Sequence, residues 1–464
     1  MENTEFKWYE KASGKKPRKP ENIEKLKLKG EVKKAEKNNK ASAEKSFHKK
    51  NFSQTLTDSK ILSLFNTEKI PAESKAILEN FGKIVSDTEK LSLKQQTLLP
   101  EKIKQLSHLL TDDRGDRRLG YMNDASFVSA YINYFQWWNL VRLVNLFSNL
   151  PSESFPVEDG DSCLDIGSGP LTIPISLWLA RPELRTKKIT FYCMDLSQNI
   201  LAAGEEIFYS ICAKTIKNGQ QPWKIVRIKG TGGTQLRTKP VFIACGNVLN
   251  ERAQNSQKEG DFLSKKFTEE IISYFDKDDN SRTKTVLIVE PGDPHSARLV
   301  SLMRTALIKR DFLPLSPCPH YLPCPMEGRT KNCPDRKWCN FAFSTENSPA
   351  SLLKLSEKSK LKKDRAVLSF VLAQKKSVIK TDEENKKTPD LQNSFFLRVA
   401  SDLIHLPEMH TAGYYCCTNI GLVLAINKSR RKIKNGDLIL CSAPPKDIKG
   451  LSTDKKTGAL IIEI

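Results

Sequence analysis

The chain has 464 residues, enough for about three domains, and a formal net charge of +21 at pH 7. No N-terminal apolar stretch resembles a signal peptide, and no apolar run approaches the ~20 residues that span a bilayer, which argues against a secreted or membrane-spanning protein. We therefore expect the 11 cysteines to be thiols of a reducing compartment, where they serve metal binding or chemistry more often than disulfides. The charge favours an anionic polymer such as RNA as the partner.

Residues 1–55 are rich in lysine and glutamate and poor in aliphatic side chains. Such a segment cannot bury enough apolar surface to offset its ordering entropy, so we predict a disordered basic arm. Its charge favours RNA contacts, and a purely solubilising tail is the alternative. The early Glu2, Glu5 and Glu10 argue against a transit peptide, so the N-terminus favours a bacterial cytoplasm, with the mitochondrial matrix as the alternative.

Residues 56–155 are predicted to form a helical region. Apolar side chains recur there at helical spacing, as at Phe127, Tyr131 and Phe135, and Pro151 ends the pattern. We expect these aromatic residues to form a buried helix face.

Residues 156–375 alternate between strand-like and helix-like segments. This alternation predicts a parallel sheet with right-handed crossovers. The expected strands are 162–169, 188–197, 223–230, 239–249, 283–294 and 365–374, and the expected helices are 172–184, 198–214 and 296–310.

A Gly-rich turn containing Asp165, Gly167, Ser168 and Gly169 lies between the first strand and its helix. The glycines let a ligand approach the backbone, and the start of the helix supplies free N–H groups. The spacing differs from the GxGxxG pattern of dinucleotide binders. The second strand ends in Asp195, where an acid can accept hydrogen bonds from ribose hydroxyls. This combination resembles the class I methyltransferases, which bind S-adenosylmethionine.

This resemblance implies roles for the candidate residues. The Gly-rich turn would line the methionine and ribose end of the cofactor, Asp195 would hold the ribose, and Asn247 would lie near the adenine. Glu290 ends a later strand beside the open side of the pocket, but the segment 290–294 lacks the Asn/Asp-Pro-Pro-aromatic loop of amino-group methylation. No catalytic residue is recognisable, so the sequence leaves methyl transfer open. The candidate cofactor-binding residues are Asp165, Gly167, Ser168, Gly169, Asp195, Asn247 and Glu290.

A Cys-rich loop at residues 316–341 carries Cys318, Cys324, Cys333 and Cys339. Flanking prolines stiffen it and disfavour a helix or central strand. A rigid loop with clustered thiols suits a soft metal or an iron–sulfur cluster, and ordinary buried cysteines are the alternative. The spacing is wider than the Cys-x(2–4)-Cys pairs of structural zinc sites, which favours a cluster without excluding zinc.

Residues 376–390 are polar and are predicted to be a linker, and residues 391–464 contain short strand-like runs. We predict a small all-β domain there, for which a nucleic-acid-binding barrel is one form. The predicted fold class is therefore α/β: a class I S-adenosylmethionine-dependent methyltransferase-like (Rossmann-like) domain with a helical N-terminal region, a Cys-rich loop and a small all-β C-terminal domain.

The run VLIVEPGDPHSARLVSLMRTALIKRDFLPLSPCPHYLPCP, followed by KWCNF and YYCCTNIG, resembles one family over about residues 120–420. This family comprises the methyltransferase-like assembly proteins of the small ribosomal subunit, found in mitochondria and bacteria. The family more often has His where Asn340 follows the third loop ligand. The resemblance implies a [4Fe–4S] cluster held by Cys318, Cys324, Cys339 and Cys417, with Cys333 as the alternate ligand and Cys417 preferred to Cys416.

The function that this resemblance implies is a small-subunit-associated assembly factor that binds rRNA, S-adenosylmethionine and the cluster. If Cys417 is a ligand, the cluster ties the β domain to the α/β domain. An active rRNA methyltransferase is the main alternative. A zinc-stapled RNA-binding protein or a redox cluster enzyme ranks lower, since the Cys-x(3)-Cys-x(2)-Cys set of radical enzymes is missing. We expect no membrane partner and a monomer away from the ribosome.

Overall fold

The computed structural model describes residues 60–111, 122, 124–254, 260–329, 336–377, 395–407, 410–441, 445, 448 and 450–464. The predicted basic arm, almost all of the predicted linker and Cys333 lie outside these residues. Residues 55–464 cluster into one unit by their contacts. Within the described part of the chain, no helix combines the length and the apolar character needed to cross a membrane.

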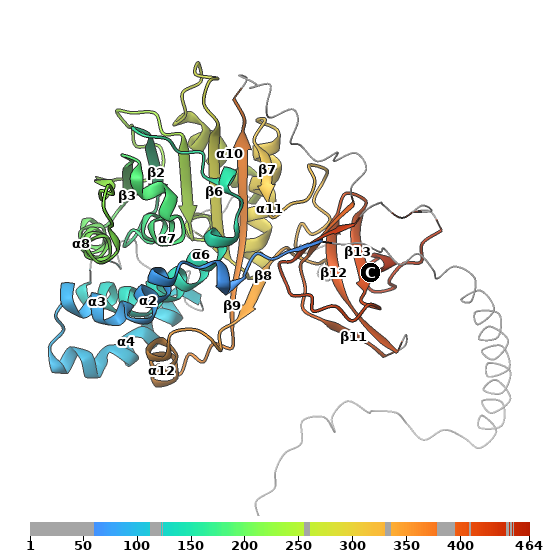
Figure 1. Cartoon of the computed structure of the whole chain (residues 1–464), viewed down its shortest axis with the longest axis horizontal. Coiled ribbons are helices and arrows are strands. Elements are labelled where there is room, and N and C mark those ends of the chain that lie inside the picture. Colours follow the sequence, from blue (N-terminus) through green and yellow to red (C-terminus); the bar gives the residue numbers. More distant parts are fainter. Residues whose placement is uncertain are drawn as a thin grey trace, which may run out of the picture. The chain divides into compact units, whose positions relative to one another are not determined.

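An eight-stranded sheet forms the centre of the α/β domain (Figure 1). Its order is β4-β3-β2-β5-β6-β9-β7, with β8 paired to β9. The strands from β4 to β6 run parallel, whereas β9 is antiparallel to β6, β7 and β8. The short strands β7 and β8 were not predicted from the sequence. The bounds are β2 Ser162–Ile166, β3 Thr190–Asp195, β4 Lys224–Lys229, β5 Phe242–Gly246, β6 Lys284–Pro291, β7 Leu313–Ser316, β8 Phe341–Ser344 and β9 Arg365–Lys375.

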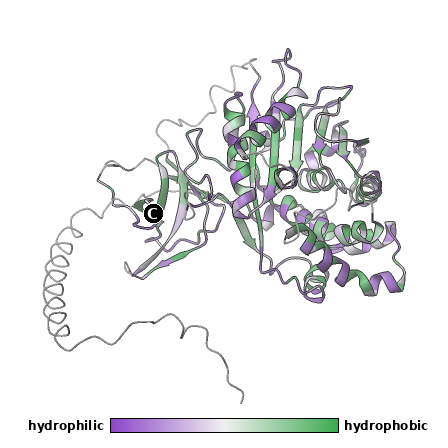
Figure 2. Ribbon diagram, turned by 180° about the vertical axis from the view of Figure 1, so that it is seen from behind, coloured by the Kyte–Doolittle hydropathy of each residue, from purple (hydrophilic) through white to green (hydrophobic). Residues whose placement is uncertain are grey.

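Both faces of this sheet are buried, because successive side chains of a strand point to opposite sides. In β2, Cys163 packs in one apolar core and Leu164 in the other, and in β5 the same holds for Phe242 and Ile243. Figure 2 shows the apolar strands in green and purple hydrophilic residues on the helices around them. The helices that follow the strands are α7 Thr172–Ala180, α8 Gln198–Thr215, α9 Leu249–Gln254, α10 Gly260–Ser273, α11 Pro294–Ile308 and α12 Ala350–Lys358.

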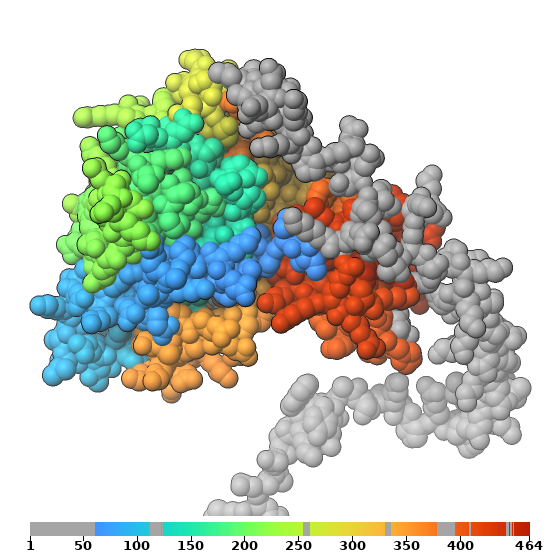
Figure 3. Space-filling view, viewed as in Figure 1, coloured from blue at the N-terminus to red at the C-terminus, as the bar shows by residue number. Residues whose placement is uncertain are grey.

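The N-terminal region is mostly helical, as predicted, but it begins with a strand, β1 Lys60–Leu62. Figure 3 shows its helices in blue beside the orange segment that includes α12, which contacts α4. Apolar side chains from α2, α3 and α6 join the core that covers one face of the large sheet. The bounds are α2 Ala72–Glu79, α3 Phe81–Thr88, α4 Leu93–Thr111, α5 Ala125–Ala130, the π-helical segment η5 Tyr131–Gln136, α6 Trp137–Asn149, and the short turns η2 Thr67–Lys69, η6 Ser152–Ser154 and η7 Pro182–Thr186.

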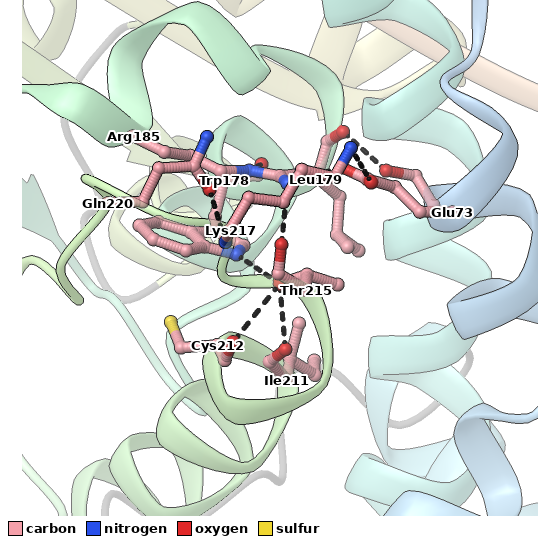
Figure 4. Close-up of polar contacts among 10 residues, drawn as sticks. Glu73, Trp178, Leu179, Arg185, Ile211, Cys212, Thr215, Lys217 and Gln220 are labelled. Carbon is pink, nitrogen blue, oxygen red and sulfur yellow. Dashed lines mark hydrogen bonds and ion pairs between the residues drawn. The ribbon is translucent and has the colours of Figure 1, made fainter.

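A buried arginine anchors this helical region to the α/β domain (Figure 4). Arg185 is fully buried; its Nε donates to Trp178 O at 2.8 Å, and its guanidinium forms an ion pair with Glu73 of α2. Lys217 contacts the second oxygen of the same carboxylate. A buried charge must be paired to avoid a large desolvation cost, so this contact fixes α2 against α7 and α8.

A second, seven-stranded sheet contains the C-terminal residues. Its order is β1-β14-β10-β12-β13-β15, with β11 paired to β12, and among the described residues its two end strands do not pair to close a barrel. The N-terminal β1 pairs with β14, so residues 60–62 belong to this sheet rather than to the helical region in which they were predicted. The bounds are β10 Phe395–Val399, β11 Ile404–Leu406, β12 Thr411–Thr418, β13 Gly421–Ile426, β14 Leu438–Cys441 and β15 Leu460–Glu463.

Candidate cofactor pocket and thiol cluster

The Gly-rich turn follows β2 at the point where the strand order reverses, between β2 and β5. Ligands of open α/β sheets bind outside the carboxyl ends of the strands at such a point. Gly167 and Gly169 have φ values of 68° and 52°. A Cβ atom on Gly167 would lie 2.3 Å from a methyl carbon of Val248, so both the backbone and the packing require glycine there.

Two buried carboxyl groups line the pocket beside this turn. Ser168 Oγ donates to Asp165 Oδ2 at 2.7 Å, while Asp165 Oδ1 has no hydrogen-bond partner. Burial raises the pKa of Asp165 to about 7. Glu290 Oε1 accepts the backbone N–H of Leu249 at 2.8 Å, and burial raises its pKa to about 8. A carboxyl group that loses water and gains no cation holds its proton more tightly, which explains both shifts.

The pocket is covered by the N-terminal helices. Arg142 of α6 donates to the backbone oxygen of Val367 at 2.8 Å and to the side chain of Asn139. Burial lowers the pKa of Arg142 to about 10. The covered space is about 40 Å³, room for only a few water molecules. The lining residues are Tyr131, Asn139, Arg142, Leu143, Asp165, Gly167, Ser168, Gly169, Thr172, Ile173, Gly246, Asn247, Val289, Glu290 and Leu368.

Six of the seven predicted cofactor-binding residues therefore meet in this pocket, and Asp195 is the exception. Asp195 Oδ2 accepts the N–H of Gly169 at 3.0 Å, and Oδ1 accepts the N–H of Ser197 at 2.9 Å. Its carboxylate braces the Gly-rich turn from the next strand and is not part of the pocket lining. The sequence analysis missed Tyr131, Asn139 and Arg142, because their helical spacing indicated only a buried face.

Cys324 lies close enough to Cys318, Cys339 and Cys417 to contribute to the raised pKa of each of these three thiols; we call the four residues the thiol cluster. Burial and then the neighbouring thiols raise the pKa of Cys339 and of Cys417 well above the usual value. Burial also raises the pKa of Cys318, and Arg304 opposes this shift. The four side chains therefore share one site although 98 residues lie between Cys318 and Cys417.

Separate elements position these thiols. Cys318 is the second residue after β7, and Ser369 of β9 donates its hydroxyl to the backbone oxygen of Cys339 at 2.6 Å. Cys417 lies on β12 of the other sheet. Because side chains alternate along a strand, the neighbouring Cys416 packs in the interior of the C-terminal sheet, away from the thiol cluster.

Two buried arginines and a histidine surround the thiol cluster. Arg304 Nε donates to Cys318 Sγ at 3.1 Å, and Arg398 Nε donates to the backbone oxygen of Pro317 at 2.8 Å. His320 Nε2 lies 3.2 Å from Cys417 Sγ, and its Nδ1 is buried without a hydrogen-bond partner. His320 stands within the Cys-Pro-His motif, whereas no local sequence pattern could have identified either arginine.

The chemistry of this donor set fits a soft metal centre, since thiolates are the preferred ligands of iron–sulfur clusters and zinc. Within the described ranges, no group of three or more His, Cys, Asp or Glu side chains is arranged to hold a metal ion. The four thiols thus share a site without forming a closed single-ion cage. Cys333, the alternate candidate, lies outside the described residues.

The strand order, the antiparallel β9 and the Gly-rich turn at the switch point define a class I methyltransferase-like protein, with a β domain joined to it at the thiol cluster. The model of one family, "Mitochondrial small ribosomal subunit Rsm22", matches residues 151–389, just over half of the chain. The chain therefore belongs to the Rsm22 family. This match bears out the resemblance to small-subunit proteins and does not support the bacterial cytoplasm that the N-terminus favoured.

Among solved structures, the chain is similar to a precorrin-6y C5,15-methyltransferase from Geobacter metallireducens, with 9% identity, 48% of this chain and 85% of that chain covered, and a TM-score of 0.27. A SAM-dependent methyltransferase from Methanosarcina mazei shares 12% identity over 49% of this chain and 97% of its own, with a TM-score of 0.24. Similarities this weak do not bear on function. No curated protein matches the chain by sequence.

Proposed function

We propose that this protein is an assembly factor of the mitochondrial small ribosomal subunit that binds rRNA, S-adenosylmethionine and a [4Fe–4S] cluster. The observation that carries the ribosomal role is the Rsm22 match over residues 151–389. The matrix of the mitochondrion is the proposed compartment, following the family's description. A monomeric state away from the ribosome is part of the proposal.

The convergence of three cysteines of the Cys-rich loop with one cysteine of β12 supports the cluster. Cys318, Cys324 and Cys339 would be the loop ligands and Cys417 the fourth, with a full set of thiolates and no open iron position. Such a centre is more often structural or electron-carrying than a site of substrate chemistry. Its loss would release the β domain from the α/β domain, because ligands from both are held by one centre.

The Gly-rich pocket supports cofactor binding. The absence of side chains at Gly167 and Gly169 lets a ligand approach the backbone of the turn, and the unpartnered Oδ1 of Asp165 can accept a hydrogen bond from a polar ligand. A bound S-adenosylmethionine supplies an electrophilic methyl group. Because the covered space is only about 40 Å³, a bound cofactor would also occupy the open part of the pocket or widen it. For Asp195 to hold the ribose, it must exchange its hydrogen bond to Gly169 for one to the ligand.

A groove on the β domain supports RNA binding. His405, His410, Lys428 and Arg430 line it, and the exposed Lys432 follows in the same connection between β13 and β14. Lys428 forms an ion pair with Glu463, so Arg430 and Lys432 are the exposed cations best suited to phosphate contacts, which release counterions from the RNA.

The experiment that tests the ribosomal role is sedimentation of tagged protein with mitochondrial ribosomal particles. We expect co-sedimentation with the small subunit or its precursors, and weakening as salt is raised. Charge reversal of Arg430 and Lys432 should lower the affinity for rRNA. The slope of the logarithm of the binding constant against the logarithm of the salt concentration should fall in magnitude by roughly one for each phosphate that is no longer neutralised. Migration of the wild-type protein free of small-subunit particles at all salt concentrations would contradict the proposal.

An active rRNA methyltransferase is the second candidate, favoured by the retained Gly-rich pocket. In the structure, the carboxyl group of Glu290 accepts hydrogen bonds from the backbone N–H of Leu249 and from Asn250 Nδ2, the latter at 2.9 Å. These bonds suit a structural role, in which Glu290 holds the start of α9 in place. Transfer of labelled methyl groups from S-adenosylmethionine to small-subunit precursor RNA decides between the candidates. Incorporation that disappears when the pocket is disrupted would make the protein an enzyme.

A further inference from the structure

Two guanidinium groups are buried next to the thiol cluster, and they come from different domains. Arg304 lies on α11 of the α/β domain and is 3% exposed, whereas Arg398 lies on β10 of the β domain and is 7% exposed. In the described part of the chain, no carboxylate forms an ion pair with either arginine. Burying an unpaired guanidinium is costly, so both positions require another source of negative charge.

The hydrogen bonds of Arg304 direct its charge to the thiols while fixing the loop. Its Nε donates to Cys318 Sγ at 3.1 Å. Its Nη2 donates to the backbone oxygens of His320 and Leu322 at 2.8 and 2.9 Å. The planar fork of arginine thereby holds the chain between Cys318 and Cys324 in one conformation, which the single ammonium of lysine cannot do.

Arg398 makes the corresponding contact from the other domain. Its Nε donates to the backbone oxygen of Pro317 at 2.8 Å, directly before Cys318, and its Nη1 donates to Gly436 O at 2.7 Å. Burial lowers the pKa of Arg398, and electrostatic interactions with Cys318, Cys339, Asp437 and Cys417 oppose that shift. One side chain therefore joins the Cys-rich loop to the C-terminal sheet and places a cation beside three of the four thiols.

We propose that Arg304 and Arg398 are the built-in counter-charges of the metal centre at the thiol cluster and set its reduction potential. This inference rests on the proposed function, in which the four thiolates hold a [4Fe–4S] cluster. Four thiolates around such a cluster in its oxidised resting state leave a net charge of about −2, which two guanidiniums neutralise.

The sign of the effect on the potential follows from the charges. Reduction adds one electron, so the reduced cluster is the more negative state and gains more from a nearby cation. The hydrogen bond from Arg304 to Cys318 Sγ acts in the same direction, because donors to cluster sulfurs stabilise the added charge. Removing either cation should shift the reduction potential to more negative values, and removing both should shift it further.

The test is a potentiometric titration of the full-length protein, purified anaerobically, in parallel with iron and sulfide analysis. Arg304→Gln and Arg398→Gln remove the charge, whereas Arg304→Lys and Arg398→Lys keep it. We expect a negative shift in both Gln variants and recovery of most of that shift in Arg398→Lys. Arg185→Gln is the matched control, because it removes another fully buried arginine whose partners are Trp178 and Glu73 rather than the thiols, and it should leave the potential unchanged.

The outcomes separate this inference from the proposed function. A wild-type protein without iron and sulfide, or with zinc alone, overturns the cluster and with it the redox role of the arginines. A loaded cluster whose potential is the same in wild type and both Gln variants overturns this inference alone. If a Gln variant fails to bind the cluster, the corresponding Lys variant is the deciding measurement. A Lys variant that binds the cluster with the wild-type potential supports a charge role. Failure of both Lys variants to bind the cluster overturns the charge role in favour of a purely structural one.

Discussion

The Gly-rich pocket and the thiol cluster are both buried polar sites, but they balance their charge differently. In the pocket, Asp165 and Glu290 have no ion-pair partner among the described residues, and burial raises the pKa of each carboxyl group. At the thiol cluster, Arg304 and Arg398 bring two cations to the sulfurs. A proton can neutralise a lone carboxylate, whereas a nearby cation stabilises the thiolate form of a cysteine.

The two sites also differ in how they are assembled. The geometry of the pocket depends on the ends of neighbouring strands in one sheet, with helix α6 closing over it. The thiol cluster needs a loop of one domain to meet a strand of the other, with Cys417 contributed by β12. We therefore expect changes in the pocket to act on ligand binding, and changes at the thiol cluster to act on how the two domains hold together.

The largest effect is expected from Cys417→Ser. Iron and sulfide should fall from about four of each per chain to a small remainder, because a bridging ligand is removed. The linker region should then become more sensitive to limited proteolysis. Cys416→Ser is the matched control: it changes the adjacent residue, whose side chain packs in the other core, and should retain the cluster. Equal iron in Cys417→Ser and wild type would refute the ligand set.

Gly167→Ala should break the pocket and leave the thiol cluster intact. The added Cβ meets Val248 at 2.3 Å, and the backbone has a φ of 68°, so we expect a loss of about 2–3 kcal/mol in the free energy of unfolding and no detectable S-adenosylmethionine binding. Gly219→Ala is the control that measures the cost of the left-handed backbone alone. Its φ is 82°, and no atom lies within 4 Å of the position that the added Cβ would take. Calorimetry measures S-adenosylmethionine binding at the pocket, and iron content reports the thiol cluster. A loss of iron in Gly167→Ala would contradict the independence of the two sites.

Glu73→Gln should loosen the attachment of α2 to the α/β domain. It removes the anion from the buried Arg185, and we expect the free energy of unfolding to fall by about 1–2 kcal/mol in denaturant titrations. Lys217→Gln removes the exposed partner of the same carboxylate and should change stability by less than about 0.5 kcal/mol. An equally large effect of both variants would argue against a dominant role for the buried pair.

The last predicted effect is a pH dependence that originates in the pocket. The folded-state pKa of Glu290 is raised to about 8, so its contribution to stability is complete below the unfolded value near 4.5 and is lost as pH rises through 8. Between pH 5 and 8 the wild type should lose more stability than Glu290→Gln in urea unfolding, by at most about 1.4 kcal/mol for each pH unit, because the folded carboxyl keeps a proton that the unfolded one has released. A wild-type slope that the substitution leaves unchanged would assign the pH dependence to other groups.

Local sequence patterns predicted much of the fold. The alternation of apolar strands and helices located β2 to β6 and β9, and the turn after β2 located the Gly-rich pocket. The clustered cysteines of the loop indicated a soft metal site, while the fourth thiol, Cys417, came from a family resemblance. The sequence did not predict that Asp195 braces the adjacent turn, because a strand-end acid can do this as readily as it can face a ligand; its role towards the ribose stays a prediction.

The sequence by itself determined which segments become strands, helices and stiff loops, because periodicity and turn chemistry act over a few residues. Only the tertiary structure decided which distant side chains meet: β1 in the C-terminal sheet, Arg142 over the pocket, and Arg304, Arg398 and Cys417 around the loop thiols. Those meetings depend on how two sheets pack, and no local pattern encodes the partner of a single arginine or cysteine many residues away.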